Sequence, residues 1–149
     1  MARWLTESEQ KTWQAYITLR QRLDAALSAG LASAGLSMAD YELLVPLSAA
    51  QDGRMRAKDL AAEVCWEKSR LSKQLARMAA RGLIDRRAAA DDARGIVVSL
   101  TPAGRELVEQ VAPEHVALVR ELFIDGMSER EAAAIESLSE RIVGAIADR

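Results

Sequence analysis

The chain has 149 residues, of which 50% are hydrophobic and only 4% aromatic, and its net charge at pH 7 is −2. This length suffices for one globular domain with a hydrophobic core, and the many alanines and leucines favour helices. The single cysteine, Cys65, excludes an internal disulfide and a cysteine-rich zinc site. The N-terminus lacks the apolar run of a signal peptide, and no stretch approaches the roughly 20 apolar residues of a membrane-spanning helix, so we expect a soluble, cytoplasmic protein with no membrane contact.

Positive charge is concentrated in the middle of the chain. Residues 54–94 contain 11 lysines and arginines and 6 aspartates and glutamates, whereas the rest of the chain contains 9 and 16. A basic middle between acidic arms is typical of a module that contacts nucleic acid and is flanked by segments that do not contact it. Chance clustering of charge on solvated helices is the alternative, but it would not explain the order of elements that follows.

Two helices are predicted before the basic region. Thr6–Glu9 has the spacing of a capping box, and apolar residues follow it at helical spacing. This pattern predicts a first helix at about residues 7–33, closed by Gly35. Ser37 is placed to cap a second helix. The predicted buried side of this second helix carries Tyr41, Leu44, Val45 and Leu47.

The basic region has the element order of a winged helix-turn-helix. Helical segments are predicted at residues 57–64 and about 68–80, and the short link between them has helix-turn-helix spacing. Two strands are predicted next, at residues 84–87 and 95–100. A hairpin directly after a helix-turn-helix forms a wing, so residues 37–100 are predicted to be a winged helix-turn-helix core.

The predicted helix 68–80 has two chemically different faces. At 100° per residue, its aliphatic side chains fall on one side: Leu71, Leu75, Met78 and Ala79. Its hydroxyl and basic side chains fall on the other, among them Ser69, Arg70, Lys73 and Arg77. We therefore expect the aliphatic face to pack against the domain and the basic face to point outward.

Two more helices are predicted after the wing. Thr101–Pro102 is a cap followed by proline at the first helical position, and Ser128–Glu131 is a second capping box that opens the last helix. The predicted fold is therefore mainly α, with about six helices and a β-hairpin wing. The compact core is too small to cover the apolar stripes of the first and last helices. We therefore expect one continuous unit, 1–149, whose arms, 1–36 and 101–149, are dimerisation helices.

The two-faced helix and the wing together point to double-stranded DNA. An α-helix fits the major groove of B-DNA, which is about 12 Å wide, and lysine and arginine neutralise phosphates with release of counterions. The residues at the N-terminal end of such a helix lie nearest the base edges, which favours Ser69, Arg70 and Lys73 for base readout. The full set of predicted DNA-binding residues is Lys68, Ser69, Arg70, Ser72, Lys73, Gln74, Arg77, Arg86, Arg87 and Arg94.

Asp92 and Arg94 lie just before the second wing strand, two residues apart. In an extended segment, side chains at this spacing point to the same side. Asp92 is therefore predicted to support the wing by holding the guanidinium of Arg94 toward a narrow minor groove, whose negative potential attracts arginine. An ordinary surface ion pair is the alternative.

The run LAAEVCWEKSRLSKQLARMAARGLIDRR, followed by DDARGIVVSLTPAG, resembles the MarR family of bacterial transcriptional regulators. The closest similarity lies in Asp92, Arg94, Leu100, Thr101, Pro102 and Gly104. The resemblance implies an obligate homodimer with interlocked first and last helices, which binds a pseudo-palindromic operator near the promoter that it controls. The wing tip, residues 88–91, is not basic here, in contrast to many relatives, so Arg86, Arg87 and Arg94 are better candidates for wing contacts than the tip itself.

The resemblance also implies that a small, aromatic and anionic effector releases the protein from DNA. It places the effector cleft among the first two helices and the start of the fifth. The candidate residues there are Trp13, Tyr16, Arg20, Tyr41 and His115. An aromatic wall with one cation suits a phenolic carboxylate, although Trp13 and Tyr16 at helical spacing are more often part of a core or a dimer interface.

Several alternatives remain open at this point. Cys65 is expected to be a buried structural residue beside Trp66, but a redox-responsive regulator acting through Cys65 is an alternative to a ligand-responsive repressor. A winged-helix protein without any effector, or a protein-interaction adaptor, would fit the same elements. An enzyme is not indicated, because the sequence offers no Ser/His/Asp set or phosphate-binding glycine loop. His115 is the only histidine, so neither a metal site nor a cofactor is predicted.

Overall fold

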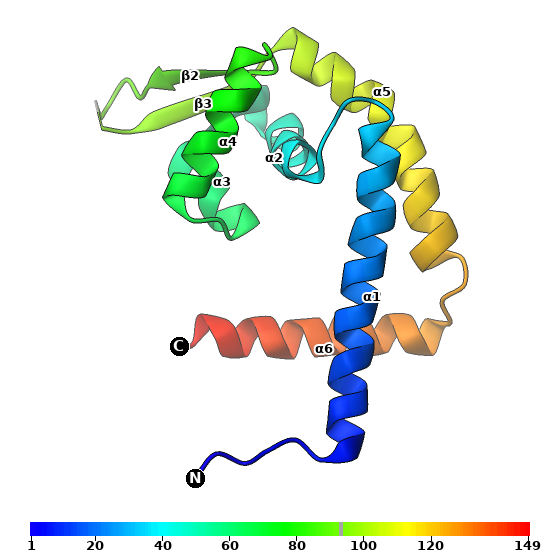
Figure 1. Ribbon diagram of the computed structural model, residues 1–149. Coiled ribbons are helices and arrows are strands. Elements are labelled where there is room, and N and C mark those ends of the chain that lie inside the picture. Colours follow the sequence, from blue (N-terminus) through cyan, green and yellow to red (C-terminus); the bar gives the residue numbers. More distant parts are fainter. Residues whose placement is uncertain (93) are drawn as a thin grey trace. The chain divides into compact units, whose positions relative to one another are not determined.

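The computed structural model describes residues 1–92 and 94–149, which form two compact units, Met1–His115 and Val116–Arg149 (Figure 1). Within the described residues there are six α-helices and one small antiparallel sheet. The predicted fold class, mainly α with a winged helix-turn-helix core, is confirmed.

The first unit begins with two helices, α1 (Glu7–Ala32) and α2 (Met38–Ala49), and each of them starts with a capping box. The side chain of Thr6 accepts from the backbone of Glu9, and the Glu9 carboxylate accepts from the backbone of Thr6 at 2.7 Å. Because two orphan N–H groups are satisfied at once, helix α1 starts where the sequence predicts. Gly35 follows its end with a φ of +75°, which favours glycine.

The helix-turn-helix consists of α3 (Ala57–Val64) and α4 (Lys68–Ala80), and both have the predicted bounds. Cys65 ends α3 in the left-handed region, with a φ of +56°, and the backbone N–H of Trp66 then donates to the carbonyl of Ala61 at 3.0 Å. This closed turn carries the chain directly into α4, with Glu67 as its N-cap residue.

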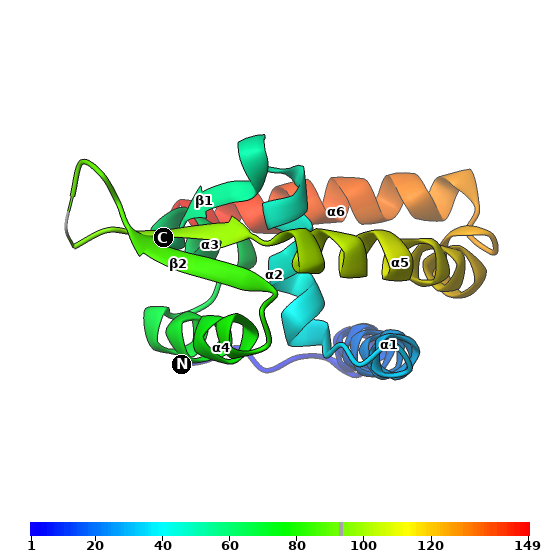
Figure 2. The same ribbon diagram turned by 90° about the horizontal axis from the view of Figure 1, so that it is seen from above.

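The wing strands β2 (Ile84–Ala88) and β3 (Ile96–Leu100) form the predicted hairpin, with bounds that differ by one residue at one end of each strand. A short strand that the sequence did not predict, β1 (Arg54–Arg56), follows the turn η1 (Gln51–Gly53) and pairs with the other side of β3. Figure 2 shows the resulting antiparallel order β1-β3-β2, with β3 in the middle. The sheet therefore connects the wing to the start of α3.

The core of the first unit lies between α1, α2, α3, α4 and the sheet. Its most buried side chains are Leu31, Leu43, Leu44, Leu47, Leu60, Met78, Ile84 and Val98. Leu71 and Leu75 of α4 also join this core, as predicted from the helical wheel. The prediction for α2 was wrong at Val45, which is 39% exposed, because Leu43 and Leu47 set the buried direction and Val45 lies on another side of the helix.

The start of α5 (Pro102–Val119) is held against the end of α4 by Thr101. The Thr101 hydroxyl donates to the carbonyl of Gly82 at 2.6 Å and accepts from the backbone N–H of Gly104 at 3.0 Å. One side chain thereby caps α5 and fixes it to the link between α4 and β2. This contact gives the Thr-Pro-x-Gly motif a structural role.

The second unit contains a π-helical turn, η2 (Arg120–Ile124), and α6 (Glu129–Ala147), whose capping box of Ser128 and Glu131 is formed as predicted. Five apolar side chains at helical spacing are exposed along α6: Ile135, Leu138, Ile142, Val143 and Ile146. Among residues 1–92 and 94–149, no helix is long and apolar enough to cross a membrane.

Candidate nucleic-acid interface

Helix α4 presents the polar and basic face that its sequence predicts. Its aliphatic side is buried, whereas six predicted DNA-binding side chains are exposed: Lys68, Ser69, Arg70, Ser72, Lys73 and Arg77. The burial of one side fixes the orientation of the other, because side chains on a helix follow each other at 100°. The basic face of α4 is thus held outward by the packing of Leu71, Leu75 and Met78.

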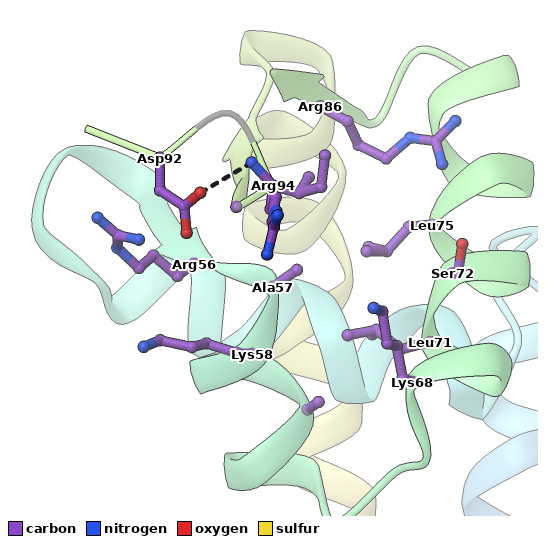
Figure 3. A pocket seen from close by; sticks show the side chains of 13 residues that line it. Arg56, Ala57, Lys58, Lys68, Leu71, Ser72, Leu75, Arg86, Asp92 and Arg94 are labelled. Atoms are coloured by element: carbon purple, nitrogen blue, oxygen red, sulfur yellow. Dashed lines mark hydrogen bonds between the residues drawn. The ribbon is translucent and has the colours of Figure 1, made fainter. Parts of the chain in front are cut away.

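A pocket of about 710 Å³ lies between the start of α3, one side of α4 and the wing (Figure 3). In Figure 3, Lys68 and Ser72 extend from α4 on one side of the pocket, and Arg56 and Lys58 lie on the opposite side. The charged side chains that line it are five bases, Arg56, Lys58, Lys68, Arg86 and Arg94, and one acid, Asp92. The pocket, called here the basic cleft, is suited to an anionic ligand such as a phosphate backbone.

Two bases of the cleft, Arg56 and Lys58, were missing from the predicted site. Both belong to the basic region of the sequence, but no motif singled them out. Arg56 comes from β1, and three residues are too few to show the alternation that identifies a strand. The count of positive charge in residues 54–94 was the one signal that included them.

The two adjacent wing arginines have different positions. Arg86 pairs with Val98 and Arg87 with Val97 across the β2–β3 ladder. Since successive strand residues point to opposite faces of a sheet, only one of them faces α4. Arg86 lines the basic cleft, whereas Arg87 is exposed and is not among the lining residues.

Asp92 and Arg94 interact differently from the prediction. The carboxylate of Asp92 accepts a hydrogen bond from the backbone N–H of Arg94 at 2.9 Å, as the dashed line in Figure 3 shows. Within the described residues, no ion pair joins their side chains. Asp92 therefore shapes the turn before β3, and the guanidinium of Arg94 extends into the basic cleft. Arg94 lies in a turn rather than in a strand, which is why the spacing argument failed.

Asp91, the neighbour of Asp92, forms an ion pair with Arg56. The guanidinium of Arg56 donates to both carboxylate oxygens of Asp91, at 2.6 and 2.5 Å. The hydrogen bond from Arg56 lowers the pKa of the Asp91 carboxyl, and the same bond raises the pKa of Arg56. The pair ties the wing loop to the strand that precedes α3.

Arg70 lies over the face of Trp66, with its guanidinium carbon 3.7 Å from the ring centroid. Trp66 is buried and lies two residues before the start of α4, so the ring is a fixed platform. Stacking on an aromatic face orients the planar guanidinium while leaving its edge N–H groups free to donate. Arg70 is therefore presented in a defined direction at the N-terminal end of α4.

Gln74 was wrongly predicted to face the DNA groove. The residue is only 6% exposed, and its amide donates to the Asp40 carboxylate at 2.7 Å. The Gln74 carbonyl oxygen accepts from Arg77 at 2.8 Å. On the helical wheel Gln74 falls beside Arg77 at the border between the two faces of α4, and the partner that buries it lies 34 residues earlier in the sequence.

The prediction that Cys65 is buried was also wrong, since the residue is exposed. Its left-handed backbone at the end of α3 turns the side chain away from the core. The sulfhydryl has a weak contact with the carbonyl of Ala62, at 3.7 Å. A solvent-exposed thiol thus lies in the turn between the two helices of the helix-turn-helix.

The five predicted effector residues form two groups in the first unit. On α1, the rings of Trp13 and Tyr16 are 5.6 Å apart, and the guanidinium of Arg20 lies 5.8 Å from the Tyr16 centroid. Tyr41 and His115 pack together, with ring centroids 4.4 Å apart. Burial raises the pKa of Tyr41 and lowers the pKa of His115.

Two further observations concern what the site can bind. In the described part of the chain, the buried Nδ1 atom of His115 has no hydrogen-bond partner. Among the same residues, no group of three or more His, Cys, Asp or Glu side chains is arranged to hold a metal ion.

The helix-turn-helix, the three-stranded wing and the basic cleft define a winged helix-turn-helix protein. The model of the MarR family matches residues 36–96, which span this core. The chain is 37% identical to AbsC, a MarR family transcriptional regulator from Streptomyces coelicolor; the match covers 99% of this chain and 100% of AbsC, with a TM-score of 0.94. This chain therefore belongs to the MarR family, whose members are transcriptional regulators rather than enzymes.

Two other structures share the fold. Sco3205, a MarR family transcriptional regulator from Streptomyces coelicolor solved in complex with DNA, is 31% identical over 97% of this chain and 91% of its own, with a TM-score of 0.93. BpsR from Bordetella bronchiseptica, whose DNA binding is regulated by 6-hydroxynicotinic acid, is 24% identical over 95% and 98% of the two chains, with a TM-score of 0.80. Among curated proteins, none matches the chain.

Proposed function

We propose that this regulator binds a pseudo-palindromic DNA operator as a homodimer and represses transcription from it. The observation that carries the proposal is the position of the basic cleft directly beside the exposed basic face of α4. Both surfaces come from the winged core, residues 37–100, and both are cationic although the whole chain is slightly acidic. Such a local excess of positive charge attracts a polyanion even when the net charge does not.

The two surfaces suit different parts of a DNA duplex. The exposed face of α4 has the size and chemistry to enter a major groove, where arginine pairs with the O6 and N7 atoms of guanine. Arg70 and Lys73 are the proposed base-reading residues at the N-terminal half of the helix. Lys68, Arg86 and Arg94 in the basic cleft would receive the phosphate backbone beside that groove. Sco3205, which is similar over almost its whole length, was solved with DNA, and this supports the assignment.

The homodimer is proposed from exposed apolar surface on both units. Trp13, Tyr16 and Leu19 of α1 are about half exposed, and α6 exposes its apolar row from Ile135 to Ile146. Apolar faces of this size are covered in stable proteins. In the proposed homodimer, the arms 1–36 and 101–149 of two copies cover these faces, and twofold symmetry places the two α4 helices in successive major grooves about 34 Å apart.

A mobility-shift assay with the DNA that flanks the gene tests the proposal. We expect a specific complex whose affinity falls steeply between about 50 and 200 mM salt, because several phosphate contacts release counterions. Light scattering on the same sample should show two copies per particle. A chain that remains a monomer, or that binds no flanking DNA at low salt, would refute the proposed function.

Single alanine variants test whether the residues of the basic cleft contact DNA or only add to the positive charge of the protein. Lys68→Ala and Arg94→Ala should weaken binding to operator and unrelated DNA alike and reduce the slope of log affinity against log salt by about one each. Arg149→Ala removes the same charge from the C-terminal residue and is the matched control, which should bind as the unmodified protein does. Equal effects of all three variants would show that the cleft does not contact DNA.

We further propose that a small aromatic anion releases the protein from its operator. Regulation by 6-hydroxynicotinic acid is described for BpsR alone; in this chain the proposal is supported by the packed rings of Tyr41 and His115 and by the buried Nδ1 atom. A buried ring nitrogen without a partner can hydrogen-bond to a ligand, and the neighbouring aromatic ring provides apolar contact. Trp13, Tyr16 and Arg20 offer a second aromatic and cationic group on α1.

Addition of salicylate-like compounds to the DNA complex tests the effector. We expect loss of the shifted band at millimolar concentrations or below, and a weaker response in a Tyr41→Ala or an Arg20→Ala variant. No response across a broad panel of aromatic acids would favour a winged-helix regulator without an effector.

The exposure of Cys65 supports a second candidate, redox control of DNA binding. Oxidation of a thiol in the turn between α3 and α4 would add polar bulk where the two helices meet. Peroxide should then abolish operator binding by the unmodified protein and spare a Cys65→Ser variant. Equal binding before and after peroxide excludes this candidate and leaves the ligand-responsive one unaffected.

A further inference from the structure

A buried carboxylate beneath α4 connects this helix to the start of α2. Asp40 is only 3% exposed. Its oxygens accept from the backbone N–H of Ser37 at 3.0 Å, from the amide of Gln74 at 2.7 Å and from the guanidinium of Arg81 at 2.7 Å. Burial alone would raise the pKa of Asp40, but the hydrogen bonds from Ser37 and Arg81 and the positive charge of Arg81 outweigh burial and lower it, so the group is charged at neutral pH. A buried charge with this many partners fixes their positions.

The charge of Asp40 determines which way the Gln74 amide points. A carboxylate can only accept hydrogen bonds, so the NH₂ group of Gln74 must face Asp40. The carbonyl oxygen of Gln74 then faces outward, where it accepts from the guanidinium of Arg77 at 2.8 Å. The reversed amide would place an oxygen against the carboxylate and an N–H against the guanidinium. The buried charge is thereby transmitted through Gln74 to an exposed base of α4.

A second branch from the same carboxylate holds the end of α4. Arg81 donates to Asp40 with one nitrogen and to the carbonyl of Gly35 at 2.8 Å with another. Gln74 and Arg81 are seven residues apart, two turns of helix, and so lie on the same side of α4. Contacts at two heights on one side oppose rotation of α4 about its axis. A rotation of about 20° would move the outer side chains of a helix by about 2 Å, enough to break a hydrogen bond to a base.

We propose that Asp40 is a positioning residue for operator readout: it fixes the rotation of α4 and, through Gln74, aims the guanidinium of Arg77 toward DNA. This inference rests on the proposed function, since it assumes that the outer face of α4 contacts the operator. Arg77 retains further N–H donors after its bond to Gln74 and can contact a phosphate or a base with them.

The variant Asp40→Asn distinguishes positioning from electrostatics, because the two effects have opposite signs. It removes one negative charge from the DNA-binding unit, so electrostatics alone predicts tighter binding to all DNA. Gln74 and Arg81 donate to different oxygens of Asp40, and asparagine replaces one of these oxygens with an NH₂ group, so positioning predicts weaker binding to the operator by about fivefold or more. Affinity for unrelated DNA should stay the same or rise. Operator affinity that is unchanged or increased in a folded Asp40→Asn protein would overturn the proposal.

A second variant keeps the test decisive if Asp40→Asn does not fold. Gln74→Met has a similar volume, leaves the bond between Asp40 and Arg81 intact and removes both hydrogen bonds of Gln74, the one to Asp40 and the one from Arg77. We expect it to weaken operator binding in the parent protein and to have a smaller effect in an Arg77→Ala background, where only the contact that holds the rotation of α4 is lost. Additive losses in the double variant would refute the link. If the parent protein binds no DNA at all, the proposed function fails instead, and that outcome is visible before any variant is made.

Discussion

A Cβ atom on Gly104, in the first turn of α5, would lie 2.2 Å from the carbonyl oxygen of Leu83. The same carbonyl accepts a hydrogen bond from the backbone of Thr101 at 3.2 Å, so the link between α4 and β2 is in direct backbone contact with the start of α5. Only a residue without a side chain fits between them. The glycine of the Thr-Pro-x-Gly motif is therefore required by packing.

Replacement of this glycine should destabilise the winged core. Gly104→Ala forces the start of α5 away from Leu83, and overpacking of this kind costs about 1–3 kcal/mol and occasionally more. Chemical denaturation should show the loss as a lower midpoint. Gly126→Ala is the matched control, because nothing lies within 4 Å of the added carbon. If both variants unfold at the same denaturant concentration as the parent, the close contact is not formed.

The ion pair of Arg56 and Asp91 should affect specificity more than stability. Both groups are at the surface, where ion pairs contribute little to folding. Asp91→Ala releases the wing loop from β1 and also removes an acid from the edge of the basic cleft. We expect affinity for unrelated DNA to rise, because a negative charge is lost, and operator affinity to rise less or to fall, because the wing is no longer held.

Paired titrations measure the ratio of the affinity for operator DNA to the affinity for unrelated DNA directly. Asp85→Ala is a suitable control, since it removes the same charge from an exposed position in β2. A ratio that is unchanged in Asp91→Ala would mean that the pair does not position the wing.

Local sequence signals predicted most of the fold. The bounds of α3 and α4 were correct because each helix has its own apolar side, and the capping boxes at Thr6 and Ser128 mark helix starts with two reciprocal hydrogen bonds. Strand β1 was missed because it has three residues and exists only through pairing with β3, more than 40 positions later. Pairing between distant segments leaves no periodic pattern in a segment this short.

The predicted exposure of the site residues was correct where it follows from the helical wheel and wrong where partners from distant parts of the chain bury a side chain. Arg70 and Lys73 are exposed because the opposite side of α4 is buried. Gln74, a polar residue at the border of the two faces, could be placed only by its partner Asp40, which the wheel of α4 does not include. Arg56 joins the basic cleft through the fold of the sheet. The sequence thus predicts a basic face and leaves the hydrogen-bond network beneath it to tertiary structure.

Replacement of the stacked Arg70 by lysine should weaken operator binding. Arg70→Lys preserves the charge but loses the planar group that lies on Trp66 and the two-pronged contact that it can make to guanine. We expect operator affinity to fall by about fivefold or more, with little change for unrelated DNA. Lys73→Arg, which also keeps its charge, should have a smaller effect. Operator binding that Arg70→Lys leaves intact would reassign Arg70 to a phosphate contact.

His115 should make the stability of the protein depend on pH just below neutrality. Burial against Tyr41 disfavours the charged imidazolium, so the pKa of His115 in the folded chain lies below its ordinary value of 6.5. Above pH 6.5 the imidazole is mostly neutral in both the folded and the unfolded chain, and the free energy of unfolding does not depend on its protonation. As the pH falls below this value, the unfolded chain binds a proton that the folded chain does not, so the free energy of unfolding decreases.

Urea denaturation at several values between pH 7.5 and pH 5 measures this loss. His115 is the only histidine in the sequence, so a His115→Asn variant should abolish most of the dependence in this window. Tyr41→Phe keeps the ring against the imidazole and should retain the dependence. If His115→Asn loses stability on acidification as steeply as the parent protein, another group is responsible and His115 is already accessible to protons in the folded state.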